Sequence, residues 1–350
     1  MIASFHRIGP EHLNWPVILS VPHAGRDYPD DLAEYCRFTP KQLRSLEDRH
    51  ADQLIDHAQS AGFAGLVART PRALIDLNRA EHDVDPGMLS APLGPTPQLS
   101  AKARGGLGLI PRRTANLGEI WRHRLHPDQV RRRIERDYRP YHAALAALLE
   151  QARLQFGGAI LLDVHSMPPL PPTRDGMAPD IVIGDRFGRS AGQVIAQHAA
   201  RSIQSAGFRL AFNTPYAGGH ILDHHARPSQ NIHGLQMRAT TYGSNAHFQL
   251  NDVTINNLLP FCLIRLVLWN KAPLGQFQRI HHFLLQALEL DPKRLVRLAV
   301  WTALDIRATN PEAWNEWKSK LLMSLTEKLL AGPTQNFLKL KSKLPDGLSG

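Results

Sequence analysis

The sequence predicts an α/β sandwich with a mostly parallel or mixed sheet. Three short apolar runs that end in polar residues predict buried strands, at residues 16–21 (PVILSV), 159–162 (AILL) and 181–184 (IVIG). Around and between them, apolar residues recur at helical spacing over residues 40–61, 128–155 and 188–205. Strands that alternate with helices favour this fold class, in which ligands bind at the carboxyl ends of strands.

Length and composition allow one large domain, or a domain with an appendage, since 43% of the 350 residues are hydrophobic. Residues 1–15 lack the apolar core of a secretory signal, and the longest apolar run, residues 258–269, is short of the roughly 20 residues that a membrane span needs. Two cysteines, Cys36 and Cys262, lie far apart, which fits a reducing compartment. We therefore expect a cytoplasmic protein with no membrane span.

A net charge of +10 makes nucleic acid a partner class to weigh. The densest arginine cluster lies in a segment with one apolar helix face, so we expect its arginines on the opposite, solvated face: Arg131, Arg132, Arg133, Arg136 and Arg139. No zinc-finger, RNP or helix-turn-helix signature accompanies the charge. No nucleic-acid partner is therefore expected, and a basic nucleic-acid-binding protein is kept only as an alternative.

The composition changes near residue 240. Lysine occurs only at Lys41 and Lys102 before this point, and eight lysines follow it. We therefore expect two parts, residues 1–239 and residues 240–350, the second mainly helical and of different origin. A frameshift, a fusion or a replaced C-terminus would each explain the change.

Two histidines follow predicted strands and are candidate metal ligands. His23 follows the strand at residues 16–21, and His165 follows the strand at 159–162. A hydrolytic zinc site needs three protein ligands and an open position for water, so a carboxylate should complete the set. Glu47 and Asp48 are the candidates for that ligand. The alternative is that each histidine is a hydrogen-bonded structural residue.

Further polar residues cluster in the segment 72–79 (RALIDLNR). Arg79, with Asn78 beside it, is suited to hold a carboxylate through paired hydrogen bonds, although a surface ion pair with Asp76 or Glu81 is an equal alternative. A glycine pair at residues 218–219 precedes the histidines of the run HILDHH, which could contribute to a site or be exposed.

Together these segments resemble the N-formylglutamate amidohydrolase family. Eight stretches match in family order over about the first two thirds of the chain: residues 20–25 (SVPHAG), the acidic segment around Asp48, 75–79 (IDLNR), 106–112 (GLGLIPR), 138–145 (YRPYHAAL), 161–168 (LLDVHSMP), 179–188 (PDIVIGDRFG) and 213–221 (NTPYAGGHI).

The resemblance implies a three-layer α/β/α fold of the phosphorylase/hydrolase type, similar to zinc carboxypeptidases. It implies a Zn²⁺ cofactor and hydrolysis of N-formyl-L-glutamate, an N-acyl amino acid, to formate and L-glutamate, a reaction of histidine degradation. The metal ligands it implies are His23, His165 and Asp48, with Glu47 as the fallback. Its substrate-binding residues map to Asn78 and Arg79, supported by Arg72.

One position departs from the family pattern. Arg238 stands where the family's strand has a glutamate, which is the best candidate for the general base by analogy with carboxypeptidases. A guanidinium cannot accept a proton at ordinary pH. Two interpretations follow: an active enzyme that uses Glu47 or His224 as its catalytic base, or a non-catalytic relative that retains metal or carboxylate binding. We expect the activity to be reduced or absent.

Overall fold

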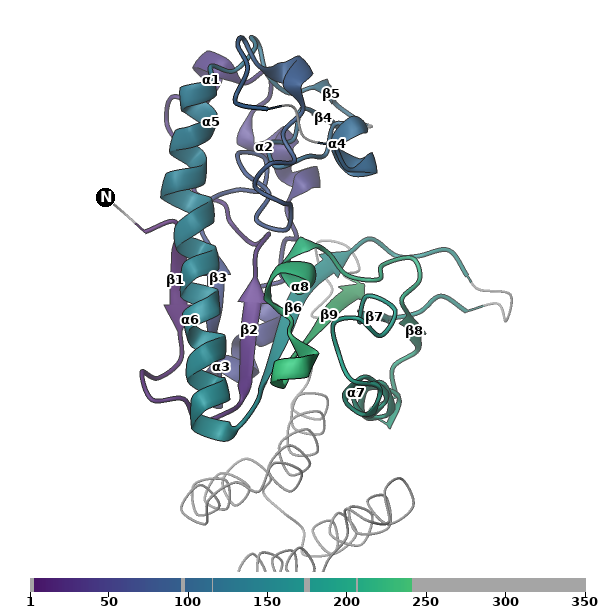
Figure 1. Cartoon of the computed structure of the whole chain (residues 1–350). Coiled ribbons are helices and arrows are strands. Elements are labelled where there is room, and N and C mark those ends of the chain that lie inside the picture. Colours follow the sequence, from purple (N-terminus) through teal and green to yellow (C-terminus); the bar gives the residue numbers. More distant parts are fainter. Residues whose placement is uncertain (1–2, 96–97, 115, 173–176, 206, 241–350) are drawn as a thin grey trace, which may run out of the picture. The chain divides into compact units, whose positions relative to one another are not determined.

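A computed structural model describes residues 3–95, 98–114, 116–172, 177–205 and 207–240. Its main element is a seven-stranded sheet with the strand order β1-β3-β2-β6-β9-β7-β8 (Figure 1). The strands of this sheet have these bounds: β1 Phe5–Ile8, β2 Val17–Val21, β3 Ala64–Ala68, β6 Ala159–Met167, β7 Ile181–Gly184, β8 Leu210–Phe212 and β9 Ile232–Thr240. A separate pair joins β4 (Arg113–Thr114) to β5 (Gly118–Glu119).

The sheet is mixed and mostly parallel, as predicted. Parallel pairs join β2 to β3, β2 to β6, β6 to β9 and β7 to β8, whereas β1–β3 and β7–β9 are antiparallel. All three predicted strands are present, and β6 extends to include His165. In the β6–β9 register, Asp163 lies opposite Gln236 and His165 lies opposite Arg238. This pairing brings the divergent position 238 next to a predicted metal ligand.

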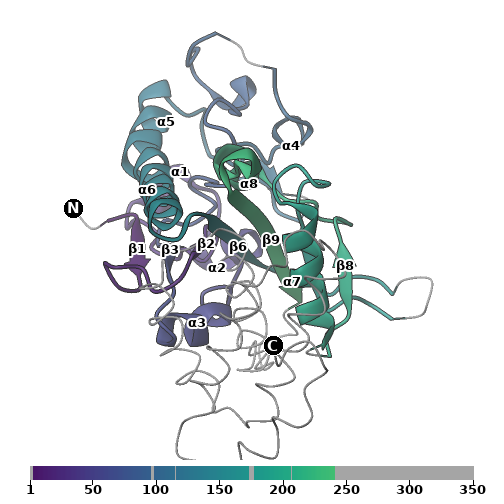
Figure 2. The same cartoon turned by 60° about the horizontal axis from the view of Figure 1, so that its bottom comes forward.

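Helices lie on both faces of the sheet. α6 packs on β2, β3 and β6, and α8 packs on β6 and β9, while α3 lies on the opposite face (Figures 1 and 2). The α-helices have these bounds: α1 Leu32–Tyr35, α2 Pro40–Leu43, α3 Asp56–Ser60, α4 Ala101–Arg104, α5 Pro127–Arg133, α6 Arg139–Phe156, α7 Gln193–Ser205 and α8 His220–His225. The predicted α/β class, similar to the zinc-carboxypeptidase type, is confirmed.

Short helical turns complete the chain path: the 3₁₀ turns η1 Arg44–Leu46, η2 Gln53–Ile55, η3 Pro86–Met88 and η5 Pro228–Gln230, and the π-helical turn η4 Ile134–Tyr138. The π turn joins α5 to α6, so the helix predicted at residues 128–155 is present as one run over 127–156. Its predicted apolar face is buried in the core, with Tyr141 and Leu145 both 0% exposed. Burial of this face on the sheet is the main stabilising contact of the helix.

Two sequence predictions were wrong in detail. The helix expected over residues 40–61 is broken into short turns, and residues 47–52 are not helical. Arg133 is buried rather than solvated with the other arginines, and its guanidinium lies 4.8 Å from the Trp121 ring centroid. Its Nη1 donates to the Leu74 carbonyl at 3.0 Å, so backbone and aromatic partners replace water around the charge.

Within the described ranges, no helix is both long enough and apolar enough to cross a bilayer. Residues 241–350 lie outside the described residues. The division expected near residue 240 and the helical character expected for residues 240–350 therefore remain predictions.

Candidate functional site

Three predicted metal ligands come together at the carboxyl ends of β2 and β6. His23 lies two residues beyond β2, and His165 lies within β6. Asp48 lies in the loop that follows η1, and its backbone amide donates to the His23 carbonyl at 3.0 Å. All three residues are buried, and one possible ligand atom from each lies within 4.8 Å of the other two. The geometry allows one shared ion, and the ion itself remains a prediction.

A second buried carboxylate holds each imidazole from its other side. His23 Nδ1 lies 3.3 Å from Asp48 Oδ2, and its Nε2 lies 2.7 Å from Asp76 Oδ1. His165 repeats the pattern, with Nδ1 2.6 Å from Asp48 Oδ2 and Nε2 2.8 Å from Asp163 Oδ2. A carboxylate that accepts the outer ring N–H leaves the inner nitrogen free to bind an ion. In both rings, Nδ1 becomes that inner nitrogen when an ion replaces the proton that it shares with Asp48 Oδ2.

Opposite charges set the protonation of this group. Burial alone would raise the pKa of Asp48, but hydrogen bonds from His165 and His23 hold that pKa well below its usual range. For His165, burial disfavours the charged ring, yet the negative charge of Asp163 raises the pKa above its ordinary value. The side chains of Asp48, Asp163, His23 and His165 therefore form one electrostatically coupled network.

The segment from Arg72 to Arg79 joins this group through Asp76. Arg72 Nε donates to Asp76 Oδ2 at 2.9 Å, and Arg79 Nη2 lies 3.7 Å from the same oxygen. Burial would raise the pKa of Asp76, but the positive charges of these two arginines hold it well below its usual range. Asn78 Nδ2 donates to Asp163 Oδ2 at 3.1 Å. All three predicted substrate-binding residues thus lie next to the predicted metal ligands.

Arg79 does form the ion pair with Asp76 that was considered as the alternative to substrate binding. The pair is buried rather than at the surface, since Asp76 is 0% exposed. Arg79 also donates from Nε to the Leu107 carbonyl at 2.8 Å. Glu81, the other partner considered, pairs with Arg139 at 2.7 Å. The role of Arg79 in holding a substrate carboxylate therefore remains a prediction.

Cationic side chains surround the buried group. Partial burial and the positive charges of Arg79, Arg238 and Arg72 lower the pKa of Lys102 to about 8. Arg79 Nη2 lies 3.7 Å from Asp76 Oδ2 and Arg238 Nη1 lies 4.0 Å from Asp48 Oδ2, so positive charges adjoin the buried carboxylates. Such a concentration of positive charge favours an anionic ligand.

Arg238 faces the predicted metal ligands from β9. Its Nη1 lies 4.0 Å from Asp48 Oδ2, and its guanidinium lies 4.6 Å from the Tyr216 ring centroid. Arg238 Nη1 also lies 3.5 Å from the Ser166 carbonyl oxygen. The position expected to carry a general base therefore presents a fixed positive charge to the site.

The two alternative bases have different surroundings. Glu47 is buried, and its Oε1 accepts a hydrogen bond from the Tyr28 hydroxyl at 2.8 Å. His224 lies in α8 in a group with His142 and His225, and not with the three predicted metal ligands. The catalytic roles of Glu47 and His224 remain predictions.

Sequence reasoning assigned no site role to Asp163, although it is central to the hydrogen-bond network. Its Oδ1 accepts from Ser20 Oγ at 3.0 Å, and its Oδ2 accepts from Gln236 Nε2 at 2.9 Å. One signal was available: Asp163 precedes His165 by two residues, and alternate residues of a strand share a face. The contact with Gln236 depends on the β6–β9 register, which local patterns do not specify.

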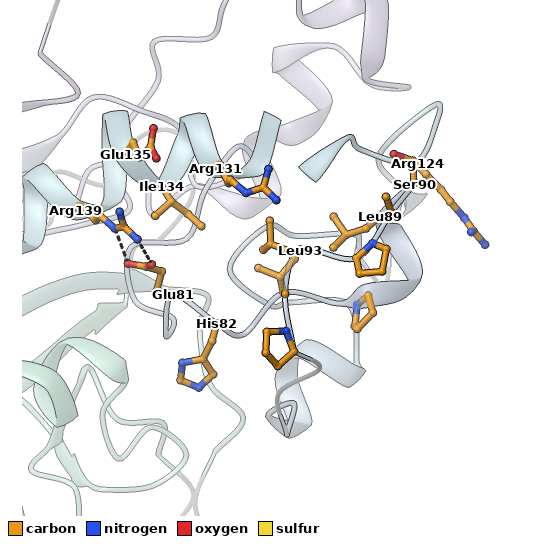
Figure 3. Close-up of a pocket in the computed structure, with 16 residues that line it drawn as sticks. Glu81, His82, Leu89, Ser90, Leu93, Arg124, Arg131, Ile134, Glu135 and Arg139 are labelled. Carbon is orange, nitrogen blue, oxygen red and sulfur yellow. Dashed lines mark hydrogen bonds and ion pairs between the residues drawn. The ribbon is translucent and has the colours of Figure 1, made fainter. Parts of the chain in front are cut away.

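A cavity of about 680 Å³ lies elsewhere, between the loop of residues 81–95 and the helix formed by α5 and α6 (Figure 3). Its lining includes His82, Arg131 and Arg139, and Arg139 pairs with Glu81 there. The predicted metal ligands and substrate-binding residues do not line this cavity. It is therefore distinct from the candidate site.

A mixed sheet covered by helices, with buried imidazoles and carboxylates at the ends of central strands, is typical of metal-dependent α/β hydrolases. The family model for N-formylglutamate amidohydrolase matches residues 15–241. The chain belongs to the N-formylglutamate amidohydrolase family.

Relatives and a solved structure agree with this assignment. The chain is 31% identical over 228 residues to N-formylglutamate deformylase of Pseudomonas putida, covering 63% of this chain and 79% of the relative. It is 28% identical over 235 residues to N-formylglutamate deformylase of Pseudomonas aeruginosa, with the same coverage of 63% and 79%. The crystal structure of N-formylglutamate amidohydrolase from Ralstonia eutropha JMP134 matches with a TM-score of 0.64 and 30% identity, covering 81% of this chain and 98% of that one.

Proposed function

We propose that this chain is a zinc-dependent amidohydrolase that cleaves N-formyl-L-glutamate to formate and L-glutamate, at a rate limited by Arg238. The buried group of His23, Asp48 and His165 is the observation that carries the proposal. The relatives named N-formylglutamate deformylase support the choice of substrate. The surrounding cations suit a substrate that carries two carboxylates.

The donor set fits Zn²⁺. Two imidazole nitrogens and one carboxylate oxygen are the ligands that this ion takes in hydrolases, and three protein ligands leave a position open. Nitrogen and oxygen ligands of a tetrahedral zinc lie roughly 3.3 Å apart. His23 Nδ1 is already 3.3 Å from Asp48 Oδ2, whereas the 2.6 Å contact of His165 Nδ1 must lengthen. A bound zinc supplies a Lewis acid for the formyl carbonyl and lowers the pKa of a water molecule to about 7.

The chain's own residues position the reactants. We assign Arg79 and Asn78 to the substrate carboxylate, with Arg72 supporting them, because paired donors fix the orientation of a carboxylate. Asp76 and Asp163 orient the two imidazoles from behind. We assign to Glu47 the proton that the missing family glutamate would otherwise accept, since the other candidate, His224, lies with His142 and His225 rather than with the proposed zinc ligands.

A second candidate function is binding of a metal or carboxylate without catalysis. One observation favours it: the Arg238 guanidinium lies 4.0 Å from Asp48 Oδ2, where it adds positive charge and accepts no proton. Loss of a general base typically lowers a rate by roughly 10² to 10⁴-fold. The two candidates therefore differ in rate rather than in the ligand set.

A formate-release assay on the purified, zinc-loaded full chain separates them. We expect slow release from N-formyl-L-glutamate that increases in Arg238→Glu and is lost in His23→Ala, His165→Ala. A wild-type kcat within tenfold of the typical value of about 10 s⁻¹ would reject the non-catalytic candidate. Undetectable release in both the wild type and a folded, zinc-loaded Arg238→Glu variant would reject the proposed enzyme.

A further inference from the structure

A second group of histidines lies outside the candidate site, between α6 and α8. One ring nitrogen each from His142, His224 and His225 lies within 4.8 Å of the other two. The ring centroids of His142 lie 5.3 Å from His224 and 5.1 Å from His225, and the latter two are 4.7 Å apart. Three imidazoles from two helices therefore converge on one point.

The hydrogen bonds of His142 orient a lone pair toward this point. Its Nε2 lies 3.0 Å from the Leu77 carbonyl oxygen, which can only accept, so Nε2 carries the proton. Its Nδ1 is therefore an acceptor, 2.8 Å from His225 Nε2. Histidines that bind metals usually donate their other ring N–H to a carbonyl or carboxylate in this way.

The surroundings favour neutral imidazoles, which are the form that binds metals. Burial lowers the pKa of His142 to about 3 and that of His225 to about 2. Burial also lowers the pKa of His224 from its ordinary value. Few protons therefore compete with an ion near neutral pH.

A fourth imidazole adjoins the group. His220 precedes His224 by four residues on α8, and their ring centroids lie 5.2 Å apart. Histidines at this spacing share a helix face, as in helical zinc-binding motifs. His220 Nε2 lies 2.9 Å from the Tyr138 hydroxyl, which also contacts the Arg79 carbonyl at 3.0 Å. The ring is thereby held next to the convergent three.

We propose that His142, His224 and His225 form a second metal site, for Zn²⁺ or a similar borderline ion such as Cu²⁺ or Ni²⁺, that joins α6 to α8. Three imidazoles without a carboxylate suit these ions and not Mg²⁺ or Ca²⁺. His142 and His225 are buried while His224 is exposed, which gives an ion a path of entry. When an ion takes the place of the proton between His142 Nδ1 and His225 Nε2, His225 carries its proton on Nδ1 instead, and the 2.8 Å contact opens toward roughly 3.3 Å.

An ion there would position α8 against the candidate active site. The Ile221 amide of α8 donates to Asn78 Oδ1 at 2.8 Å, and Asn78 Nδ2 donates to Asp163. Asp163 in turn holds His165. The second site would thus fix the helix that supports a predicted substrate-binding residue, without contacting the substrate.

Metal titration of the chelator-stripped full chain tests the site in the His23→Ala, His165→Ala background, which removes the first set of ligands. Cu²⁺ is the probe, because its electron paramagnetic resonance spectrum reports nitrogen ligands. We expect an ion with nitrogen ligands whose affinity falls more than about 100-fold with His224→Ala. Loss of a residue that only hydrogen-bonds to a metal ligand costs less, roughly 10- to 100-fold. His123→Ala, which removes an exposed imidazole outside the group, is the matched control.

Equal Cu²⁺ affinity and an unchanged spectrum in the folded His224→Ala chain would overturn the second site. His224→Gln, which keeps a polar side chain at this exposed position, gives the same comparison if the alanine variant does not fold. Both comparisons are made after the first ligand set is removed. Failure of the first metal site or of the proposed hydrolase activity would therefore leave the result on His224 unaffected.

Discussion

Replacing Arg238 with glutamine is expected to tighten zinc binding at the candidate site. Arg238 Nη1 lies 4.0 Å from Asp48 Oδ2, so a cation bound to Asp48 would lie close to the guanidinium. Two unit charges 4 Å apart interact by about 4 kcal/mol at an effective dielectric constant of about 20. Zinc carries two charges and would lie roughly 2 Å beyond the carboxylate oxygen, so its repulsion by a rigid guanidinium is of similar size or larger.

Movement of the arginine reduces this repulsion, because its long side chain can withdraw toward Tyr216. We therefore expect Arg238→Gln to lower the zinc dissociation constant at least tenfold, equivalent to about 1.4 kcal/mol. Competition with a chromophoric chelator measures the constant. Arg153→Gln is the matched control, since Arg153 forms an exposed ion pair with Glu150 at 2.6 Å. Unchanged or weaker zinc binding in folded Arg238→Gln would refute the electrostatic reasoning.

Three further predictions concern the support of the site, its charge and the core. Asp163→Asn should weaken zinc binding roughly 10- to 100-fold in the chelator assay, because an amide does not orient His165 as the carboxylate does. Unchanged zinc affinity would show that Asp163 does not support the site. Since the pKa of Lys102 is about 8, its positive charge is present below that pH and lost above it. The dissociation constant of L-glutamate, measured by calorimetry, should therefore rise between pH 7 and pH 9 in the wild type but not in Lys102→Arg. The same pH dependence of this constant in both proteins would exclude a role for the Lys102 charge. Leu145→Ala should lower the free energy of unfolding by about 2–5 kcal/mol in urea titrations, because loss of the fully buried side chain leaves a cavity. A decrease below about 1 kcal/mol would contradict the place of Leu145 in the core.

Local sequence patterns were sufficient to predict three strands of the sheet, β2, β6 and β7, and the main helix. The run from Ile181 to Gly184 is buried as expected, and so is the apolar face that includes Tyr141. Such periodicities reflect burial on one face, which tertiary contacts reinforce. The prediction of a helix over residues 40–61 was wrong because the same periodicity also fits a series of short helical turns. Residues 47–52 form a non-helical loop that places Asp48 near the strand ends.

The candidate site could be predicted in part. His23 and His165 follow from their places at strand ends, and Asp48 followed from resemblance to the family. The second carboxylates could not be assigned, since the contact of Asp76 with His23 joins residues 53 apart in the chain. The position of Arg238 depends likewise on strand register. Contacts of this kind depend on the assembled sheet rather than on local propensity.

The account depends most directly on one shared cation at His23, Asp48 and His165. Zinc content per folded chain, measured by mass spectrometry after dialysis against limiting zinc, tests this for the wild type and the His23→Ala, His165→Ala variant. We predict that the variant retains one zinc ion fewer than the wild type. Equal zinc content in the two folded proteins would contradict the central claim.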